Sequence, residues 1–180
     1  MRILMITDVF FPRINGVSTS IQIFMRELEK LGHQVTLIAP DYGQAETQEN
    51  IIRIPSGGIL FDPEDRLLKR RKVLALRHQL KQQNFDVIHI QTPFMAHYLG
   101  VALAREFGIP CLESYHTYFE EYLFHYVPFV PKSWMRLFAR YFTRKQCNAV
   151  NAVVVPSTAM QDVLTSYGVT TLMQIIPTGM

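Results

Sequence analysis

The sequence predicts an α/β fold: a doubly wound, mainly parallel sheet in a single Rossmann-like domain. Short apolar runs alternate along the chain with longer segments in which apolar residues recur at helical spacing. This alternation is typical of parallel strands joined by helical crossovers. The chain has 180 residues, a usual length for one domain that buries its own core. We therefore expect one domain over residues 1–180, without internal repeats.

Five segments are predicted to be strands because their apolar residues follow one another almost without interruption. Such runs are typical of strands that are buried on both faces. The five segments are Arg2–Asp8, Gln34–Pro40, Asp86–Ile90, Ile109–Ser114 and Ala152–Pro156. Shorter apolar runs at Ile51–Ile54 and Gln174–Ile176 indicate two further strands.

Three of the segments between these strands are predicted to be helices. The clearest has an apolar stripe from Val17 to Leu31 and is closed by Gly32. A second helix is expected from Asp62 to about Gln83, because an aspartate followed by proline is typical of an N-cap and first turn. The third is expected over Pro131–Lys145.

The composition excludes several classes of protein. With 48% apolar and 18% charged residues, the chain does not have the composition of a disordered protein. A net charge of +3 is too mild for a dedicated nucleic-acid binder, so we expect no nucleic-acid partner. No apolar run is long enough for a spanning helix and the start does not have the pattern of a signal peptide, so a cytoplasmic location is expected. Cys111 and Cys147 are predicted to be buried thiols.

The candidate ligand-binding residues follow the predicted strands, because ligands of such sheets bind at the carboxyl ends of the strands. Gly16 starts the first predicted helix, where a positive φ would let a backbone N–H approach an anion; an ordinary turn explains the Asn15–Gly16 pair equally well. His116 ends another strand and can bind a sugar hydroxyl or a phosphate. His89 is expected to be a core histidine, and no spacing indicates a metal site. The fingerprints of dinucleotide and P-loop sites are missing.

Six segments resemble, in order and spacing, the retaining GT-B-fold glycosyltransferases of family 4. This resemblance implies the N-terminal, acceptor-binding half of a two-domain enzyme, whose C-terminal domain holds most of the nucleotide-sugar contacts and lies outside these residues. The segments are Arg2–Asp8 with Pro12 and Gly16, Leu31–Val35, Phe85–His89, Tyr115–Thr117, Ala152–Ser157 and Ile176–Gly179.

The resemblance also implies an activity. Family members transfer a hexose from a nucleotide diphosphate sugar with retention, usually without a metal, so no cofactor is expected. His116 would contact the donor sugar, and the Gly16 N–H would contact the donor phosphate. The family often has two glycines where this chain has Asn15–Gly16, so the phosphate contact depends on Gly16 alone. The family's C-terminal pair of glutamates is missing, which predicts an excised or natural half-protein.

A more specific resemblance concerns residues 115–126. This stretch is similar to the one that follows the same histidine in diacylglycerol glucosyltransferases of the family, with one extra residue here. It implies a lipid acceptor such as diacylglycerol. Expected acceptor contacts are Asn15, Tyr115, Glu120 and Glu121. Glu120 and Glu121 are adjacent and would diverge on a helix, which disfavours the paired carboxylates of a hydrolase.

The predicted helix over Pro131–Lys145 has basic and aromatic residues on opposite faces. Such a helix can lie on an anionic membrane, here the inner face of the cell membrane. A solvated outer layer over a packed core is the alternative. The aromatic face has Trp134, Leu137, Phe138, Tyr141 and Phe142, and the basic face has Lys132, Arg136, Arg140 and Arg144. Lys132, Trp134, Arg136, Arg140 and Arg144 are the expected membrane contacts. A second basic run comprises Arg66, Lys69, Arg70, Arg71 and Lys72.

The last part of the chain is almost uncharged. From Gln146 to Met180 the only formally charged side chain is Asp162. Interface cores are depleted of charge, so this segment indicates either a surface covered by the missing domain or a buried last strand and helix. Two other functional classes remain open from the sequence: a non-catalytic nucleotide- or anion-binding module, and a peripheral membrane adaptor.

Overall fold

The computed structural model describes residues 1–43, 48–59, 62–116 and 132–177 of the chain. In this part, one sheet has the strand order β4-β3-β2-β1-β5-β6-β7-β8. All neighbouring strands are parallel except β3 and β4, so the predicted doubly wound, mainly parallel sheet is confirmed. The order changes direction between β1 and β5. At such a switch point the loops after neighbouring strands diverge and leave room for a ligand.

Seven of the eight strands were expected from the sequence, because buried parallel strands are almost continuously apolar. The strands are β1 (Arg2–Ile6), β2 (Gln34–Asp41), β3 (Ile51–Ile59), β4 (Asp62–Leu68), β5 (Val87–Ile90), β6 (Cys111–Ser114), β7 (Ala152–Val155) and β8 (Leu172–Ile175). The one that was not expected is β4.

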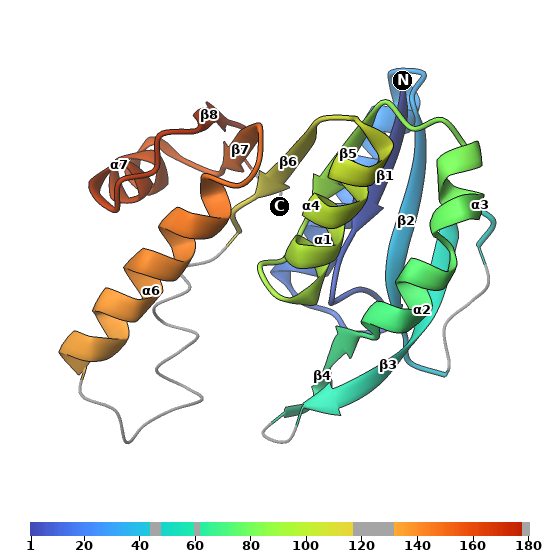
Figure 1. Ribbon diagram of the computed structural model, residues 1–180, viewed down its shortest axis with the longest axis horizontal. Coiled ribbons are helices and arrows are strands. Elements are labelled where there is room, and N and C mark those ends of the chain that lie inside the picture. Colours follow the sequence, from blue (N-terminus) through green and yellow to red (C-terminus); the bar gives the residue numbers. More distant parts are fainter. Residues whose placement is uncertain (44–47, 60–61, 117–131, 178–180) are drawn as a thin grey trace.

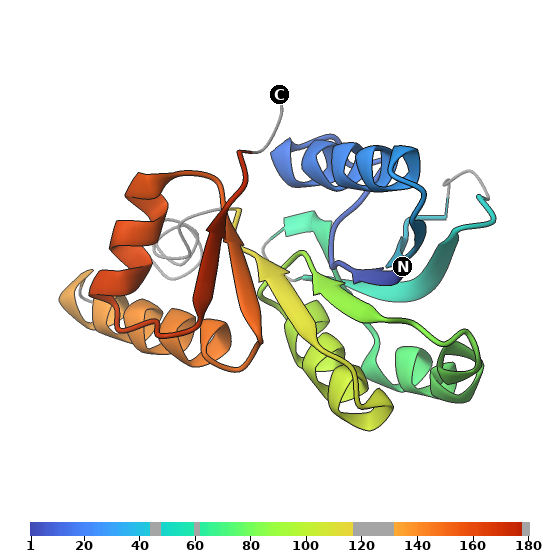
Figure 2. The same cartoon turned by 90° about the horizontal axis from the view of Figure 1, so that it is seen from above.

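Helices cover both faces of the sheet, as Figure 2 shows for α1 on one side and α2, α3 and α4 on the other. The helices are α1 (Gly16–Lys30), α2 (Arg70–Ala75), α3 (Arg77–Gln82), α4 (Met95–Phe107), α6 (Lys132–Cys147) and α7 (Thr158–Ser166). Alternate residues of the strands face the two sides. Ile3 and Met5 pack with α1, whereas Leu4 and Ile6 belong to the larger core on the side of α4. The elements and the two chain ends are labelled in Figure 1.

The helix expected from Asp62 is wrong at its beginning. Asp62–Leu68 is strand β4, which pairs antiparallel with β3, and helices begin only at Arg70. An Asp-Pro pair favours a helix start through one turn of backbone only, whereas pairing with β3 gives the segment several backbone hydrogen bonds. Because β4 is the edge strand, it also tolerates Pro63, which has no N–H to donate.

Two smaller expectations concern the cysteines and the membrane. Cys111 and Cys147 are free and buried, as predicted, and burial raises the pKa of both thiols. Among the described residues, no helix is both long and apolar enough to cross a bilayer.

Gly100 of α4 is required by close packing against the sheet. An added Cβ would lie 2.5 Å from Ile90 Cγ1 and 3.3 Å from Ile6 Cγ2. We expect Gly100→Ala to lower the free energy of unfolding by about 1–3 kcal/mol, because overpacking outweighs the gain in helix propensity. Chemical denaturation measures this change. Ala102→Gly, at an exposed position of the same helix, gives the propensity contribution alone. Unchanged or increased stability of Gly100→Ala would contradict the packing argument.

Candidate functional site at the carboxyl ends of the central strands

The candidate site lies where β1, β5 and β6 end side by side. These three strands are neighbours in the sheet, and all run in the same direction. The chain segments that leave them carry Asp8, Gln91 and His116. Residues far apart in the sequence are thereby brought to one edge.

His116 is held in a defined orientation at the end of β6. Its Nε2 lies 3.0 Å from Gln91 Oε1. Because an amide oxygen only accepts, the imidazole donates from Nε2, and Nδ1 is left as an acceptor. Burial lowers the pKa of His116 to about 4, so the ring is neutral near pH 7. The arrangement provides a fixed, uncharged acceptor.

His89 lies next to this pair but is engaged within the core. Its Nε2 is 2.8 Å from Ser114 Oγ, and its ring meets the edge of Phe24 at 5.5 Å between centroids. Burial lowers the pKa of His89 to about 3, and the nearby His116 lowers it further in the same direction. His89 is the buried core histidine that was expected.

The N-terminus of α1 begins at Gly16, close after the end of β1. Asn15 caps the helix, since its Oδ1 accepts from the Ser18 N–H at 2.8 Å. Gly16 does not adopt the positive φ that was expected. That part of the prediction is wrong, because Gly16 is already the first helical residue and the turn before it is made by Asn15 in extended conformation. A Cβ on Gly16 would meet no atom within 4 Å, so the space beside this helix end is open.

Three buried polar atoms near these elements lack hydrogen-bond partners among the described residues. They are Ser18 Oγ and Ser20 Oγ on α1 and Gln91 Nε2 after β5. Their residues are 0, 4 and 1% exposed, respectively. Buried polar groups are nearly always satisfied. Unpartnered donors close to an open helix end are therefore consistent with a polar ligand that completes them.

Asp8 connects the loops of the site, a role that was not predicted from the sequence. Its Oδ2 accepts from the Ala96 N–H at 2.7 Å and from Thr92 Oγ1 at 3.0 Å, and its Oδ1 accepts from the Leu68 N–H at 3.1 Å. Phe94, the N-cap residue of α4, makes no side-chain cap, so Asp8, which follows β1, caps this helix instead. Burial raises the pKa of Asp8 to about 6. No local pattern reveals such a contact, because its partners lie 60 to 88 residues away.

The expected acceptor residues are only partly described. Tyr115 is buried with the core on the side of α4, and its Oη lies 3.3 Å from Thr143 Oγ1. It is therefore turned into the fold, and we leave it out of the acceptor site proposed below. Asn15 uses its Oδ1 as a helix cap, which leaves Nδ2. Glu120 and Glu121 lie outside the described residues.

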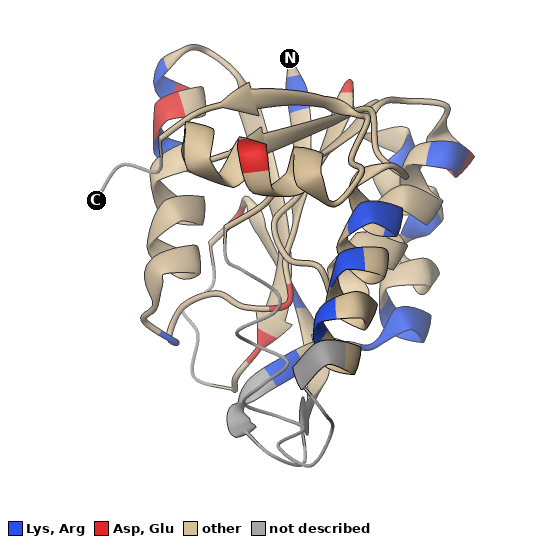
Figure 3. Ribbon diagram, turned by 90° about the vertical axis from the view of Figure 1, so that its left-hand side faces the viewer, with Lys and Arg blue, Asp and Glu red and all other residues tan. Residues whose placement is uncertain are grey.

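Helix α6 presents three faces rather than two. Met135, Ala139 and Thr143 are buried, whereas the described basic residues and four of the five residues of the aromatic set are exposed and Phe142 is half-buried. The expectation of opposite faces is corrected accordingly: Met135, Ala139 and Thr143 form an inward face, which leaves the basic residues and most of the aromatic set on the two outer faces. Figure 3 shows basic residues along α6 and one acidic residue on α7. The exposed set is Trp134, Arg136, Leu137, Phe138, Arg140, Tyr141 and Arg144, and nothing is described of the Lys132 side chain.

The uncharged end of the chain is partly exposed. Leu172 of β8 is 71% exposed, and Gln174 and Ile176 are exposed as well. Burial of the last strand therefore does not explain the missing charges. An apolar and neutral surface is present instead.

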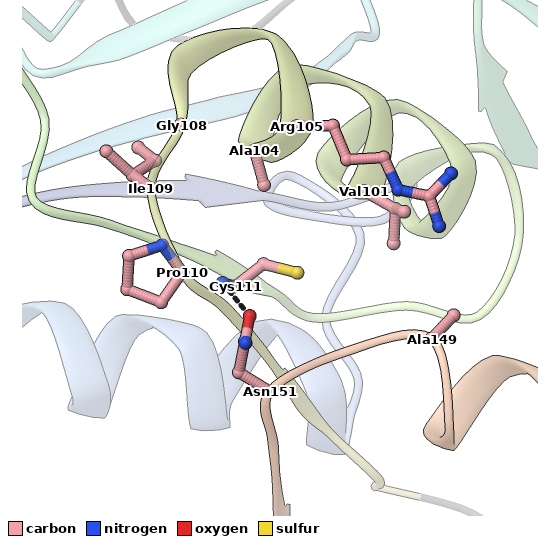
Figure 4. Close-up of a pocket in the computed structure, with 9 residues that line it drawn as sticks. All are labelled: Val101, Ala104, Arg105, Gly108, Ile109, Pro110, Cys111, Ala149 and Asn151. Carbon is pink, nitrogen blue, oxygen red and sulfur yellow. Dashed lines mark hydrogen bonds between the residues drawn. The ribbon is translucent and has the colours of Figure 1, made fainter.

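The pocket in Figure 4 lies at the opposite edge of the sheet and is separate from the site. It has a volume of about 490 Å³, and Gly108, Pro110 and Cys111 line it where β6 begins. Asn151 Oδ1, also in its wall, already accepts from the Cys111 N–H at 2.9 Å. Among the described residues, no group of three or more His, Cys, Asp or Glu side chains is arranged to hold a metal ion.

Comparison with known proteins identifies the family. The Glycosyltransferase Family 4 model matches residues 14–180. Alpha-monoglucosyldiacylglycerol synthase of Streptococcus pneumoniae is 36% identical over 99% of this chain, and the enzyme of the same name from Acholeplasma laidlawii is 35% identical over 71%. The chain spans 40 and 32% of these relatives' lengths. The structure of Anabaena HepE in complex with UDP-glucose is similar over the whole chain and 44% of its own length, with a TM-score of 0.65 and 12% identity, which shows a common fold. The chain belongs to Glycosyltransferase Family 4.

Proposed function

We propose that the chain is the N-terminal domain of a two-domain, retaining glycosyltransferase, which transfers a hexose from a nucleotide diphosphate sugar to a lipid such as diacylglycerol. The observation that carries the proposal is the neutral His116, which Gln91 orients at the edge where such sheets bind ligands. The names of the two bacterial relatives support the lipid acceptor. Their lengths support a second domain, which would supply most nucleotide contacts.

In this proposal the chain provides two groups for the donor. His116 Nδ1 accepts a hydrogen bond from a sugar hydroxyl, while Nε2 remains bound to Gln91. The open N-terminus of α1 points N–H groups and the positive end of its dipole towards the diphosphate. Negative charge grows on the leaving phosphate in the transition state, so donors placed there accelerate the transfer. Ser18 and Ser20 of α1 and Gln91, next to His116, each have a buried polar atom without a described partner. No metal or other cofactor is required.

The second domain would cover the uncharged surface that includes Leu172 and Ile176. Closure between two domains excludes water from the donor. The acceptor would enter near Asn15, Glu120 and Glu121. The test is enzymatic: the extended protein should transfer hexose from a sugar nucleotide to diacylglycerol, and the 180-residue chain alone should not. Robust turnover by the chain alone would overturn the two-domain proposal, and nucleotide binding without transfer by the extended protein would favour a non-catalytic module.

Gly16→Ala separates the donor contact from folding. The structure leaves room for the new methyl group, so stability should be unchanged. The methyl group would occupy the space that the diphosphate needs, and we expect kcat/KM of the extended enzyme to fall about tenfold, equivalent to about 1.4 kcal/mol. Thr158→Ala, at the first residue of α7, is the matched control. An unchanged rate would remove Gly16 from the donor site.

The second part of the proposal is that α6 binds the inner face of the cell membrane. Its exposed arginines lie beside exposed Trp134, Phe138 and Tyr141, which is the composition of an interfacial helix. Two arginines also pack within the protein: Arg140 lies 5.2 Å over the Tyr167 ring, and Arg144 lies 5.9 Å over the Tyr141 ring. A contact with an aromatic ring holds a guanidinium group in place and leaves its positive charge unchanged.

Vesicle sedimentation tests this contact. We expect binding to phosphatidylglycerol vesicles and weaker binding to neutral vesicles, because each basic residue near an anionic surface contributes about 1 kcal/mol. Binding should be lost at high salt, because salt screens this attraction. Changing Arg136, Arg140 and Arg144 to Glu should abolish binding. The control changes Arg26, Lys81 and Arg105, which are exposed on other helices, to Glu. Equal binding of both variants would assign α6 to a solvated outer layer. Vesicle binding by an extended protein without transferase activity would favour a membrane adaptor.

A further inference from the structure

Tyr42, Arg53 and Arg66 form a cluster that the proposed transfer does not use. The Arg66 guanidinium lies 5.1 Å over the ring of Tyr42. Arg53 Nη1 donates to the Pro40 carbonyl at 3.2 Å, and Arg66 Nη1 donates to the Asp41 carbonyl at 3.0 Å. Both arginines are therefore fixed around the end of β2.

The cluster has an unusual number of unsatisfied donors. Six buried side-chain polar atoms lack a hydrogen-bond partner among the described residues, and Tyr42 Oη, Arg53 Nε and Arg66 Nε are three of them. Burial raises the pKa of Tyr42 and the Phe10 backbone opposes this effect, but no hydrogen bond from the Tyr42 hydroxyl to another described group is present. All three atoms can donate a hydrogen bond. Donors without acceptors are costly in a folded protein, and here they gather at one place.

The two arginines of the cluster also have no ion pair with a described residue to balance their positive charge. Arg53 donates to the carbonyls of Phe11 and Pro40, and its guanidinium lies 5.4 Å over the Phe10 ring. Neither Arg53 nor Arg66 forms a salt bridge with a described residue. The carboxylate of Asp41 is near but accepts from the Gly43 N–H at 2.8 Å. Burial lowers the pKa of Arg53, and Asp41 only partly opposes this effect.

The cluster is distinct from the site around His116. Arg53 is the register partner of Ala39 on β2, and Ala39 packs in the core on the side of α1. In the sheet, β2 and β3 lie on one side of β1, whereas β5 and β6 lie on the other. A ligand at the cluster would therefore lie across β1 from His116.

We infer that Tyr42, Arg53 and Arg66 form a binding site for a phosphate group. Guanidinium groups recognise phosphate through pairs of N–H donors, and a half-buried site strengthens these charge-assisted bonds. Each of the two arginines uses only Nη1 in a described hydrogen bond, which leaves other N–H groups for the ligand. The phosphate belongs either to a phospholipid head group or to a small molecule in solution. The inference does not depend on the transferase activity.

The first test is phosphate binding by the 180-residue chain. Inorganic phosphate is titrated against sodium chloride of equal ionic strength, and the amide resonances of Gly43 and Ser56, whose backbone or side chain contacts Asp41, are followed by NMR. We expect saturable shifts with phosphate alone. Arg66→Gln should weaken binding about tenfold, because one charge-assisted contact is lost. Arg71→Gln removes the same charge at an exposed position of α2 and should have no effect. Shifts that do not saturate, or that both variants reduce equally, would overturn the inference.

Tyr42→Phe separates binding from folding. The variant removes a hydroxyl without a partner, so the melting temperature without phosphate should be unchanged or higher. Phosphate affinity should still fall severalfold. A lower melting temperature with unchanged affinity would show that the hydroxyl serves the fold, and would overturn its place in the site.

A second measurement identifies the source of the phosphate. Glycerol 1-phosphate in solution is compared with phosphatidylglycerol vesicles, for the wild type, Arg66→Gln and Arg71→Gln. Selective loss of vesicle binding in Arg66→Gln supports a lipid head group. Selective loss of glycerol 1-phosphate binding supports a soluble ligand. If Arg66→Gln keeps both vesicle binding and glycerol 1-phosphate binding, the proposed phosphate site is contradicted.

Discussion

His116→Ala is expected to reduce kcat/KM of the extended enzyme by about 10- to 1000-fold. The substitution removes the acceptor that Gln91 orients towards the proposed donor sugar. Loss of one or two well-placed polar contacts in the transition state costs about 1.4–4 kcal/mol, which corresponds to this range. The ring is neutral near pH 7 because burial lowers its pKa to about 4, so the loss reflects hydrogen bonding and not charge.

The control is His78→Ala, which removes an exposed histidine from α3. Steady-state kinetics of both variants, together with circular dichroism of the folded proteins, separates the effect on transfer from an effect on folding. A fall in kcat at unchanged KM would indicate a contact made in the transition state. A rate of His116→Ala equal to that of the His78→Ala control would make His116 a structural residue at the strand end.

The fold could be predicted largely from local patterns, because buried parallel strands and amphipathic helices each have a distinct period. The exception is β4, where Asp62 and Pro63 have the local pattern of a helix start but belong to a strand that pairs with β3. β3 comes directly before β4 in the chain, but an apolar period does not show that these two segments pair. Tertiary contacts decide such cases.

The site could be predicted only where it depends on position in the fold. His116 follows from the rule that ligands bind at strand ends, whereas its partner Gln91 was not predicted and is brought close by the pairing of β5 and β6. Asp8 and the Tyr42 cluster could not be predicted, because their contacts join segments that only the sheet order brings together. At Gly16 the residue type alone gave the wrong backbone conformation. A glycine suggested a positive φ, but the backbone there is helical, and the space where a side chain would lie is open.

Asp8→Ala is expected to lower the free energy of unfolding by about 3 kcal/mol or more. The variant leaves the N–H groups of Ala96 and Leu68 and the hydroxyl of Thr92 without their acceptor, and each unsatisfied buried donor costs about 1–3 kcal/mol. Removing a buried carboxyl group also relieves its desolvation, which reduces the sum. The lost hydrogen bonds involve β4, the segment after β5 and α4 together. Urea denaturation should therefore show one cooperative transition with its midpoint at a lower urea concentration. A loss below about 1 kcal/mol would contradict the role of Asp8 as a shared cap.

The pH dependence of Asp8→Asn tests the same contact through its proton. Burial raises the pKa of Asp8 from its ordinary 3.8 to about 6, so the folded protein holds this proton more tightly than the unfolded chain does. The stability from the protonated group is fully present below pH 3.8 and is lost as pH rises through 6, and the rise in pKa from 3.8 to about 6 corresponds to about 3 kcal/mol. Asparagine has no such proton. The wild type should therefore exceed Asp8→Asn in stability most at pH 4, and this advantage should shrink steadily by pH 7. A stability difference that does not change with pH would contradict this prediction. It would mean that Asp8 has the same pKa in the folded and the unfolded protein, because its hydrogen bonds to Ala96, Leu68 and Thr92 lower the pKa as much as burial raises it.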